Sequence, residues 1–209
     1  MDSIFKSYYG MVLLLCAMLL FVLPDRAISK HWPGIKAGTN YSWPYPKNYK
    51  PYSRSYPAGY FAGLSIQVDK SRNLSLVSEL LVVEGSQYVE YYSTSELTHL
   101  NKFTYYSLSC PVMLQIKINS FIYFNTGPTI GYLIKATCKS YNRSPVNIAQ
   151  ELPRFVLNYT IGIGNEIQYQ KCRIGLELRY LIGLTRYRHE KYPWDWRNHS
   201  VQAGLNFLF

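Results

Sequence analysis

A two-residue alternation of apolar and polar side chains runs through most of the chain beyond residue 30, and it constrains the fold more than any other feature. Successive side chains of a β-strand point to opposite faces, so the alternation predicts strands with one apolar and one polar face. No helical periodicity of 3.6 residues competes with it in that part of the chain. Eight strands are predicted, at residues 33–43, 58–70, 74–88, 102–118, 121–138, 154–169, 173–187 and 199–209.

The links between the predicted strands alternate strictly between long and short. The short links are tight turns at residues 71–73, 119–120 and 170–172. The long links are rich in polar residues, proline or tyrosine, and they cover residues 44–57, 89–101, 139–153 and 188–198. An even number of strands with short turns at one rim and long loops at the other is typical of bacterial outer-membrane proteins. We therefore expect an all-β fold, an eight-stranded antiparallel up-and-down transmembrane β-barrel with short periplasmic turns and longer extracellular loops.

Alternation alone does not distinguish a soluble barrel from a membrane barrel. The apolar face points inward in a soluble barrel and outward, toward lipid, in a membrane barrel, and both give the same period of two. The predicted polar face carries charges of both signs within the strands, at Lys36, Glu79, Lys117, Lys135, Glu166, Glu177 and Arg179. An eight-stranded barrel has an interior just wide enough for side chains, and buried charges must be paired. We predict a static interior ion-pair network of Lys36, Glu79, Glu166, Glu177 and Arg179. A proton or ion path along the same residues is the alternative.

Two further features favour a membrane barrel. Aromatic residues gather near the predicted strand ends, as in an interfacial girdle, at Tyr41, Trp43, Tyr60, Tyr105, Tyr106, Phe121, Tyr123, Tyr169 and Tyr187. The last residue, Phe209, lies on the apolar face of the last predicted strand. This ending resembles the C-terminal signal that the outer-membrane barrel assembly machinery recognises, so we expect that machinery as a partner.

The N-terminal residues have the features of an export signal. Residues 11–23 form an unbroken apolar run that is too short to span a membrane, which takes about 20 residues, but matches the core of a secretory signal. Pro24 ends the run, and Ala27 and Ser29 supply the small residues of a cleavage site. We expect residues 1–29 to be a signal peptide and residues 30–209 to be the outer-membrane β-barrel domain.

The formal net charge of +10 raises the question of an anionic partner. The chain has no Lys/Arg-rich run, zinc-ligand spacing or helix-turn-helix pattern, so we expect no nucleic acid. Residues 41–60 and 186–199 place Lys and Arg beside Tyr and Trp. Cations beside flat aromatic rings suit sugar phosphates, which makes outer-membrane lipid and lipopolysaccharide the expected partners. A solvated rim facing lipid headgroups is the alternative.

The sequence predicts no catalytic residue, no cofactor and no metal site. His99, His189 and His199 have Ser200 and Asp195 near them in the sequence, but a catalytic triad is defined by geometry and not by sequence proximity. Solvated loop residues are the preferred interpretation. Beyond residue 30 there are three cysteines, an odd number without the close spacing of a disulfide framework or a metal site: Cys110, Cys138 and Cys172.

Short sequence blocks are spread over residues 33–209: GIKAG at 34–38, AGL at 62–64, LVSELL at 76–81, YSLSCP at 106–111, NTGP at 125–128, GIGNE at 162–166 and LELRY at 176–180. In their order and spacing these blocks resemble the PorT-like outer-membrane β-barrel family of Bacteroidetes. The resemblance implies a predominantly eight-stranded barrel without established catalytic residues. It also links some members to the secretion and gliding apparatus, which would make secretion-system components partners.

The expected function is a non-enzymatic structural or interaction role in the outer membrane, with an accessory part in protein secretion or envelope assembly as its finer form. Two alternatives stay open. One is an outer-membrane lipid-modifying enzyme, such as a lipid A deacylase or acyltransferase. The other is a soluble, lipocalin-like periplasmic binder.

Overall fold

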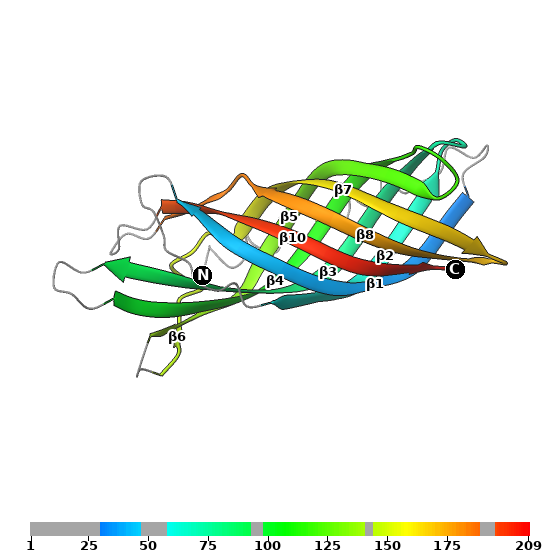
Figure 1. Cartoon of the computed structure of the whole chain (residues 1–209). Coiled ribbons are helices and arrows are strands. Elements are labelled where there is room, and N and C mark those ends of the chain that lie inside the picture. Colours follow the sequence, from blue (N-terminus) through cyan, green and yellow to red (C-terminus); the bar gives the residue numbers. More distant parts are fainter. Residues whose placement is uncertain (1–29, 47–57, 93–97, 141–143, 189–194) are drawn as a thin grey trace, which may run out of the picture.

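The computed structural model describes residues 30–46, 58–92, 98–140, 144–188 and 195–209. Eight long strands form a single antiparallel sheet that closes on itself (Figure 1). These strands are β1 (Lys30–Pro46), β2 (Gly59–Asp69), β3 (Leu74–Tyr92), β4 (Thr98–Lys117), β5 (Ile122–Ser140), β7 (Phe155–Tyr169), β8 (Cys172–Gly183) and β10 (Asp195–Leu208). Two short strands, β6 (Val146–Asn147) and β9 (Arg186–Arg188), pair with β5 and β10 beside the long loops.

The barrel closes through the pairing of β1 with β10, which runs from Gly34 opposite Leu208 to Pro46 opposite Trp196. Closure satisfies the backbone hydrogen bonds of both edge strands, which is what a sheet in a lipid bilayer needs. The expected all-β, eight-stranded antiparallel barrel is therefore confirmed. The predicted signal peptide, residues 1–29, lies outside the described residues. No helix in the described ranges is long and apolar enough to cross a membrane.

The predicted strand bounds need correction at the rim with the long loops, which is the extracellular rim of such a barrel. The predicted loop 89–101 is partly strand, because β3 and β4 stay paired as far as Tyr92 opposite Thr98. This hairpin projects beyond the rest of the barrel (Figure 1). The strand predicted at 173–187 ends at Gly183 and resumes as β9. Outside the lipid, backbone pairing continues without the apolar alternation on which the sequence prediction depended.

Tight turns join the strands at the opposite, periplasmic rim. The carboxamide oxygen of Asn119 accepts hydrogen bonds from the backbone N–H groups of Phe121 and Ile122, at 2.8 and 2.7 Å. Gln170 has a φ of 54°, a left-handed conformation that a two-residue hairpin turn requires. The short turns therefore have defined local structure, as the sequence predicts.

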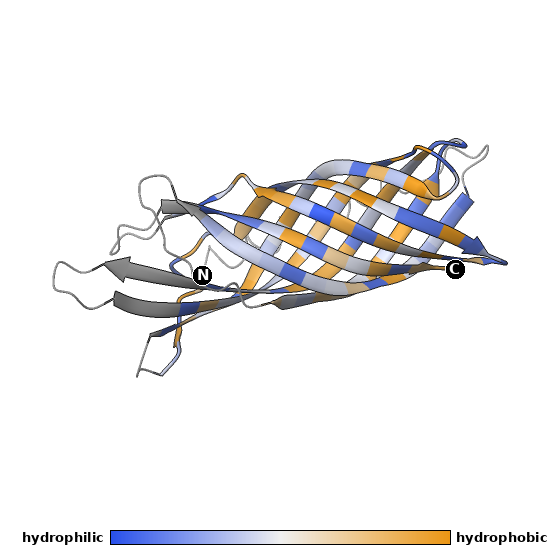
Figure 2. Cartoon of the chain, viewed as in Figure 1, coloured by the Kyte–Doolittle hydropathy of each residue, from blue (hydrophilic) through white to orange (hydrophobic). Residues whose placement is uncertain are grey.

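The apolar side chains of the strands point outward and the charged ones point inward. Along β8 the exposed fraction of the side chains alternates, with Leu176 at 56%, Glu177 at 6%, Leu178 at 52% and Arg179 at 2%. Figure 2 shows the same alternation of hydrophobic and hydrophilic residues along the strands of the barrel wall. This is the arrangement of a barrel surrounded by lipid and the inverse of a soluble barrel.

Two groups of side chains depart from the predicted facing. Lys135, expected on the inner face, is exposed on the outside, because a bulge shifts the β4–β5 register beside Tyr106. The outer face carries Tyr41, Tyr60, Tyr106, Phe121 and Tyr169 of the predicted aromatic girdle, all of them exposed. Three other members face the interior instead: Tyr105, Tyr123 and Tyr187. Aromatic residues therefore fill the barrel as well as surround it.

Candidate functional site

Four charged side chains occupy the middle of the barrel. Lys36 on β1 contacts both Glu79 on β3, at 3.2 Å, and Glu177 on β8. The guanidinium of Arg179 donates two hydrogen bonds to the carboxylate of Glu79, at 2.6 and 2.5 Å, and also bonds Glu177. All four side chains are almost completely buried. Two positive and two negative charges meet, so the cluster is formally neutral.

The Glu79–Arg179 pair crosses the full width of the barrel. In the closed ring of strands, β3 and β8 are four strands apart in either direction, so they lie opposite each other. A bidentate carboxylate–guanidinium pair between opposite walls spans the lumen at this level. We call Lys36, Glu79, Glu177 and Arg179 the central network.

Uncharged groups from β5 complete the central network. The carboxamide of Asn125 donates to Glu177 at 2.5 Å, and the hydroxyl of Tyr123 donates to the same carboxylate at 3.2 Å. The ring of Tyr123 lies over Gly164 of β7, where a Cβ atom would come within 2.4 Å of it. A glycine on one strand thus makes room for a long side chain from the next, which is how a narrow barrel accommodates them.

Glu166, expected with the other four, belongs to a separate cluster at the periplasmic rim. Its carboxylate lies 3.2 Å from Arg173 and 3.6 Å from Lys117. Arg173 also pairs with Asp69 at 2.9 Å, and its guanidinium stacks on Trp32, 3.9 Å from the ring centre. The sequence pattern gives the facing of Glu166 but not its height in the barrel, and that height decides its partners.

A polar cavity of about 410 Å³ opens beside this periplasmic cluster. Its lining residues are Arg72, Asn73, Lys117, Asn119, Ser120, Glu166, Gln168 and Arg173. The central network lies between this cavity and the residues of the extracellular half of the lumen.

The extracellular half of the lumen holds a second, uncharged polar cluster. The hydroxyl of Tyr105 lies 2.8 Å from that of Ser42 and accepts a hydrogen bond from the carboxamide of Asn198 at 2.7 Å. Asn40 donates to Ser42 at 3.0 Å. The cavity beside these groups has a volume of about 40 Å³, which is large enough for ordered water but not for a ligand.

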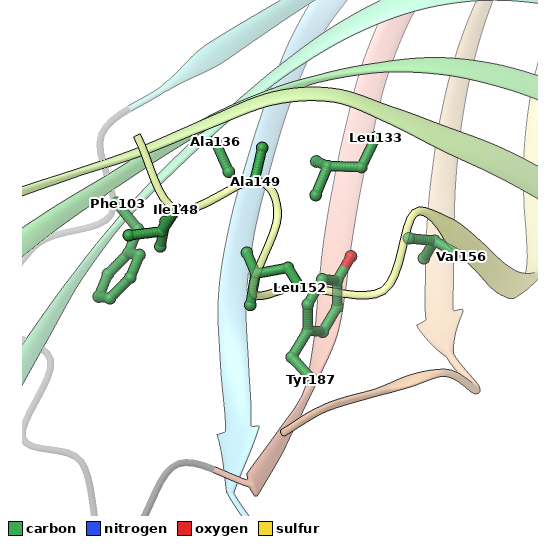
Figure 3. Close-up of a cluster of buried hydrophobic side chains, with 8 residues drawn as sticks. All are labelled: Phe103, Leu133, Ala136, Ile148, Ala149, Leu152, Val156 and Tyr187. Atoms are coloured by element: carbon green, nitrogen blue, oxygen red, sulfur yellow. The ribbon is translucent and has the colours of Figure 1, made fainter. Parts of the chain in front are cut away.

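Above this cluster, part of the β5–β7 loop folds into the barrel mouth. Ile148, Ala149 and Leu152 are buried against side chains of the wall, as Figure 3 shows. Those wall side chains are Phe103, Leu133, Ala136, Val156 and Tyr187. The N–H of Ile148 donates to the carbonyl of Ala136 at 2.9 Å. We call residues 148–152 the plug.

The sequence pattern does not predict the plug, which falls in the link expected to be a long polar loop at 139–153. The apolar residues Val146, Ile148, Ala149 and Leu152 form a short group between prolines, and they follow neither strand nor helix periodicity over a useful length. Ile148 and Leu152 are four residues apart, but this spacing is too short to interpret alone.

Gly85 offers a test of how tightly the upper lumen is packed. A Cβ atom at Gly85 would lie 1.9 Å from the Tyr105 ring, so Gly85→Val must displace that ring and break its hydrogen bonds. We expect the free energy of unfolding to fall by about 2–4 kcal/mol, measured by urea titration in detergent. Gly131→Ala is the control, because its nearest neighbours would be 3.7 Å away. Equal stability of Gly85→Val and the wild type would contradict the packing.

The described residues do not assemble the catalytic triad considered from the sequence. His199 is outward, with its Nδ1 atom 3.0 Å from the Tyr180 hydroxyl, whereas Ser200 is buried on the opposite face of β10. His99, His189 and Asp195 have side chains outside the description. No cluster of three His, Cys, Asp or Glu side chains suited to a metal ion occurs in the described ranges.

A family model and several solved structures are similar to this chain. A family model described as outer membrane protein β-barrel domain matches residues 32–187. The outer membrane protein OprG from Pseudomonas aeruginosa is 10% identical, over 86% of this chain and 95% of OprG, with a TM-score of 0.50. The attachment invasion locus protein Ail of Yersinia pestis is 16% identical, over 86% and 99% of the two chains, with a TM-score of 0.43. Neisserial surface protein A is 12% identical, over 88% and 100%, with a TM-score of 0.43. No curated protein matches the sequence.

Proposed function

The chain belongs to the outer membrane protein β-barrel domain family and lies in the outer membrane, and from this premise we propose that it is a closed, non-enzymatic barrel. Its role is structural or interaction-mediating, and it acts through its two rims and its lipid-facing surface. The lumen conducts nothing. The soluble lipocalin-like alternative does not fit a barrel whose apolar side chains face outward.

The observation that carries this proposal is the bidentate Glu79–Arg179 pair between opposite strands. A solute crossing the barrel would have to separate these two side chains, and an unpaired charge in so narrow a space is costly. The plug adds a second obstruction at the extracellular mouth. Both obstructions are built from side chains packed against the wall.

Conductance in planar bilayers tests the closed barrel. We expect the refolded protein to insert without discrete conductance steps, while a 16-stranded porin prepared in the same way conducts. Stepwise conductance from the wild-type barrel would overturn the proposal.

Lipid A incubated with the protein should keep its mass spectrum unchanged. Loss or gain of an acyl chain would support the lipid-modifying alternative instead.

The finer form of the proposal is an accessory part in protein secretion or envelope assembly. The sequence blocks that resemble the PorT-like family support it, together with a lumen that leaves only the rims and the outer surface for contacts. Phe209 is exposed on the outer face at the periplasmic rim, where the barrel assembly machinery would reach it. Cross-linking in detergent-solubilised outer membrane would identify secretion-system partners, and a barrel that captures lipid alone would count against this role.

A further inference from the structure

Three lysines lie on the outer face of the barrel near its extracellular rim. Lys102 comes from β4, and Lys135 and Lys139 come from β5. Lys102 lies directly opposite Lys139, and Lys135 lies directly opposite Tyr106. Residues directly opposite each other in an antiparallel pair turn their side chains to the same face. Tyr106 is exposed on the outside, so Lys135 shares the lipid-facing side with it.

The bulge in β5 brings Lys135 to this face. Ser107 is opposite Leu133 and Tyr106 is opposite Lys135, so Ile134 is an extra residue without a partner on β4. Leu133 is buried in the lumen, whereas Ile134 is 51% exposed and Lys135 is exposed too. Without the extra residue, strict alternation would turn Lys135 into the barrel. The bulge therefore adds an outward cation at the cost of a regular ladder.

No described acidic side chain forms an ion pair with the three ammonium groups. Like charges directly opposite on neighbouring strands destabilise a sheet, and Lys102 and Lys139 form such a pair. The acidic side chains described at this end are Glu84 and Glu151. Glu84 is on β3 opposite Tyr106, so β4 lies between it and Lys135, and Glu151 is in the β5–β7 loop. Glu90 on β3 is opposite Leu100, two residues from the partner of Lys102, and its side chain lies outside the description.

The height of the lysines relative to the membrane follows from the apolar band on β4. Its outward residues run from Ile116 through Leu114, Val112 and Leu108 to Tyr106. About 9–11 tilted residues span the hydrocarbon core, so Tyr106 and Lys135 lie at the headgroup level of the outer leaflet. Lys102 and Lys139 are four residues further out along their strands, roughly 10 Å above that level.

We propose that Lys102, Lys135 and Lys139 bind the phosphate groups of one lipopolysaccharide molecule in the outer leaflet. Lys135, beside the amphipathic ring of Tyr106, meets a lipid A phosphate at the headgroup level. The Lys102–Lys139 pair meets phosphate on the sugar core above it. Lysine binds phosphate as a point charge, and an anion between Lys102 and Lys139 relieves their repulsion. This inference needs the outer-membrane location but not the closed lumen.

The test compares refolded variants for binding to fluorescent lipopolysaccharide in detergent, in buffer without divalent cations. We expect K102Q/K135Q/K139Q to lose at least about tenfold in affinity, since each lysine near an anionic surface contributes about a few-fold. The control variant K70Q/R72Q/K171Q removes the same charge from the exposed periplasmic turns and keeps wild-type affinity. Gel migration before and after heating shows that both variants are folded barrels.

Two further ligands identify the chemistry. Dephosphorylated lipopolysaccharide should bind the wild type and the triple variant equally weakly. The difference in affinity between the wild type and the triple variant should be smaller for vesicles of phosphatidylglycerol than for intact lipopolysaccharide. The proposed site would be overturned if the triple variant bound lipopolysaccharide as tightly as the wild type, or if the periplasmic control lost as much affinity as the triple variant. It would also be overturned if the wild type and the triple variant differed in affinity for phosphatidylglycerol as much as they do for lipopolysaccharide.

Discussion

Replacing Glu79 with leucine is expected to lower the free energy of unfolding by about 3–5 kcal/mol, because it leaves buried charge without its partner. The change leaves Lys36 and Arg179 buried with Glu177 as their remaining charged partner. It also removes the bidentate pair that joins the opposite strands β3 and β8. Urea unfolding in detergent or vesicles, followed by tryptophan fluorescence, measures the loss.

The double variant Glu79→Leu/Lys36→Met is the matched control for this prediction. It removes one charge of each sign and leaves the Arg179–Glu177 pair balanced. We expect it to be more stable than Glu79→Leu alone, because a balanced pair costs less than an uncompensated buried charge. A single variant within about 1 kcal/mol of the wild type, or a double variant less stable than the single one, would contradict a charge-balanced central network.

Placing arginine at Leu178 is the second large effect. Leu178 is outward and in the middle of β8, so the guanidinium would enter the centre of the hydrocarbon layer. We expect a loss of about 2–4 kcal/mol in the free energy of unfolding from lipid vesicles.

The depth dependence of that loss separates lipid from other causes. Ile167 is also outward, but it lies on β7 near the periplasmic turn. Ile167→Arg should cost only about 0–1 kcal/mol, because the charge reaches the interface there. A neutral effect of arginine at Leu178, or equal losses at both positions, would mean that these side chains do not contact the hydrocarbon core.

The positions of the eight strands followed from the sequence because lipid and lumen select opposite side chains at every second residue. That selection acts over about ten residues per strand, so the pattern is long enough to identify. It ends where the membrane ends. The outer parts of β3 and β4, which pair from Val83 opposite Ser107 to Tyr92 opposite Thr98, are therefore only partly visible in the sequence.

The interior was predictable in kind but not in detail. Period-two alternation placed Lys36, Glu79, Glu177 and Arg179 on one face, and the structure brings all four together. Which of them meet depends on the stagger between strands, which alternation does not encode, so Glu166 was grouped with partners that it does not contact. Lys135 was assigned to the wrong face because a single inserted residue inverts the alternation beyond it.

A spin-label scan of β8 tests most directly whether the outward apolar face of this strand lies in lipid. Single nitroxides at residues 174–182, in a variant whose native cysteines are replaced, are compared in reconstituted membranes for relaxation by oxygen and by an aqueous nickel chelate. Labels at even-numbered positions should respond to oxygen, which concentrates in lipid, while odd-numbered labels respond weakly to both reagents. If the even-numbered labels were relaxed mainly by the nickel chelate, the apolar face of β8 would lie in water, which would contradict a barrel surrounded by lipid.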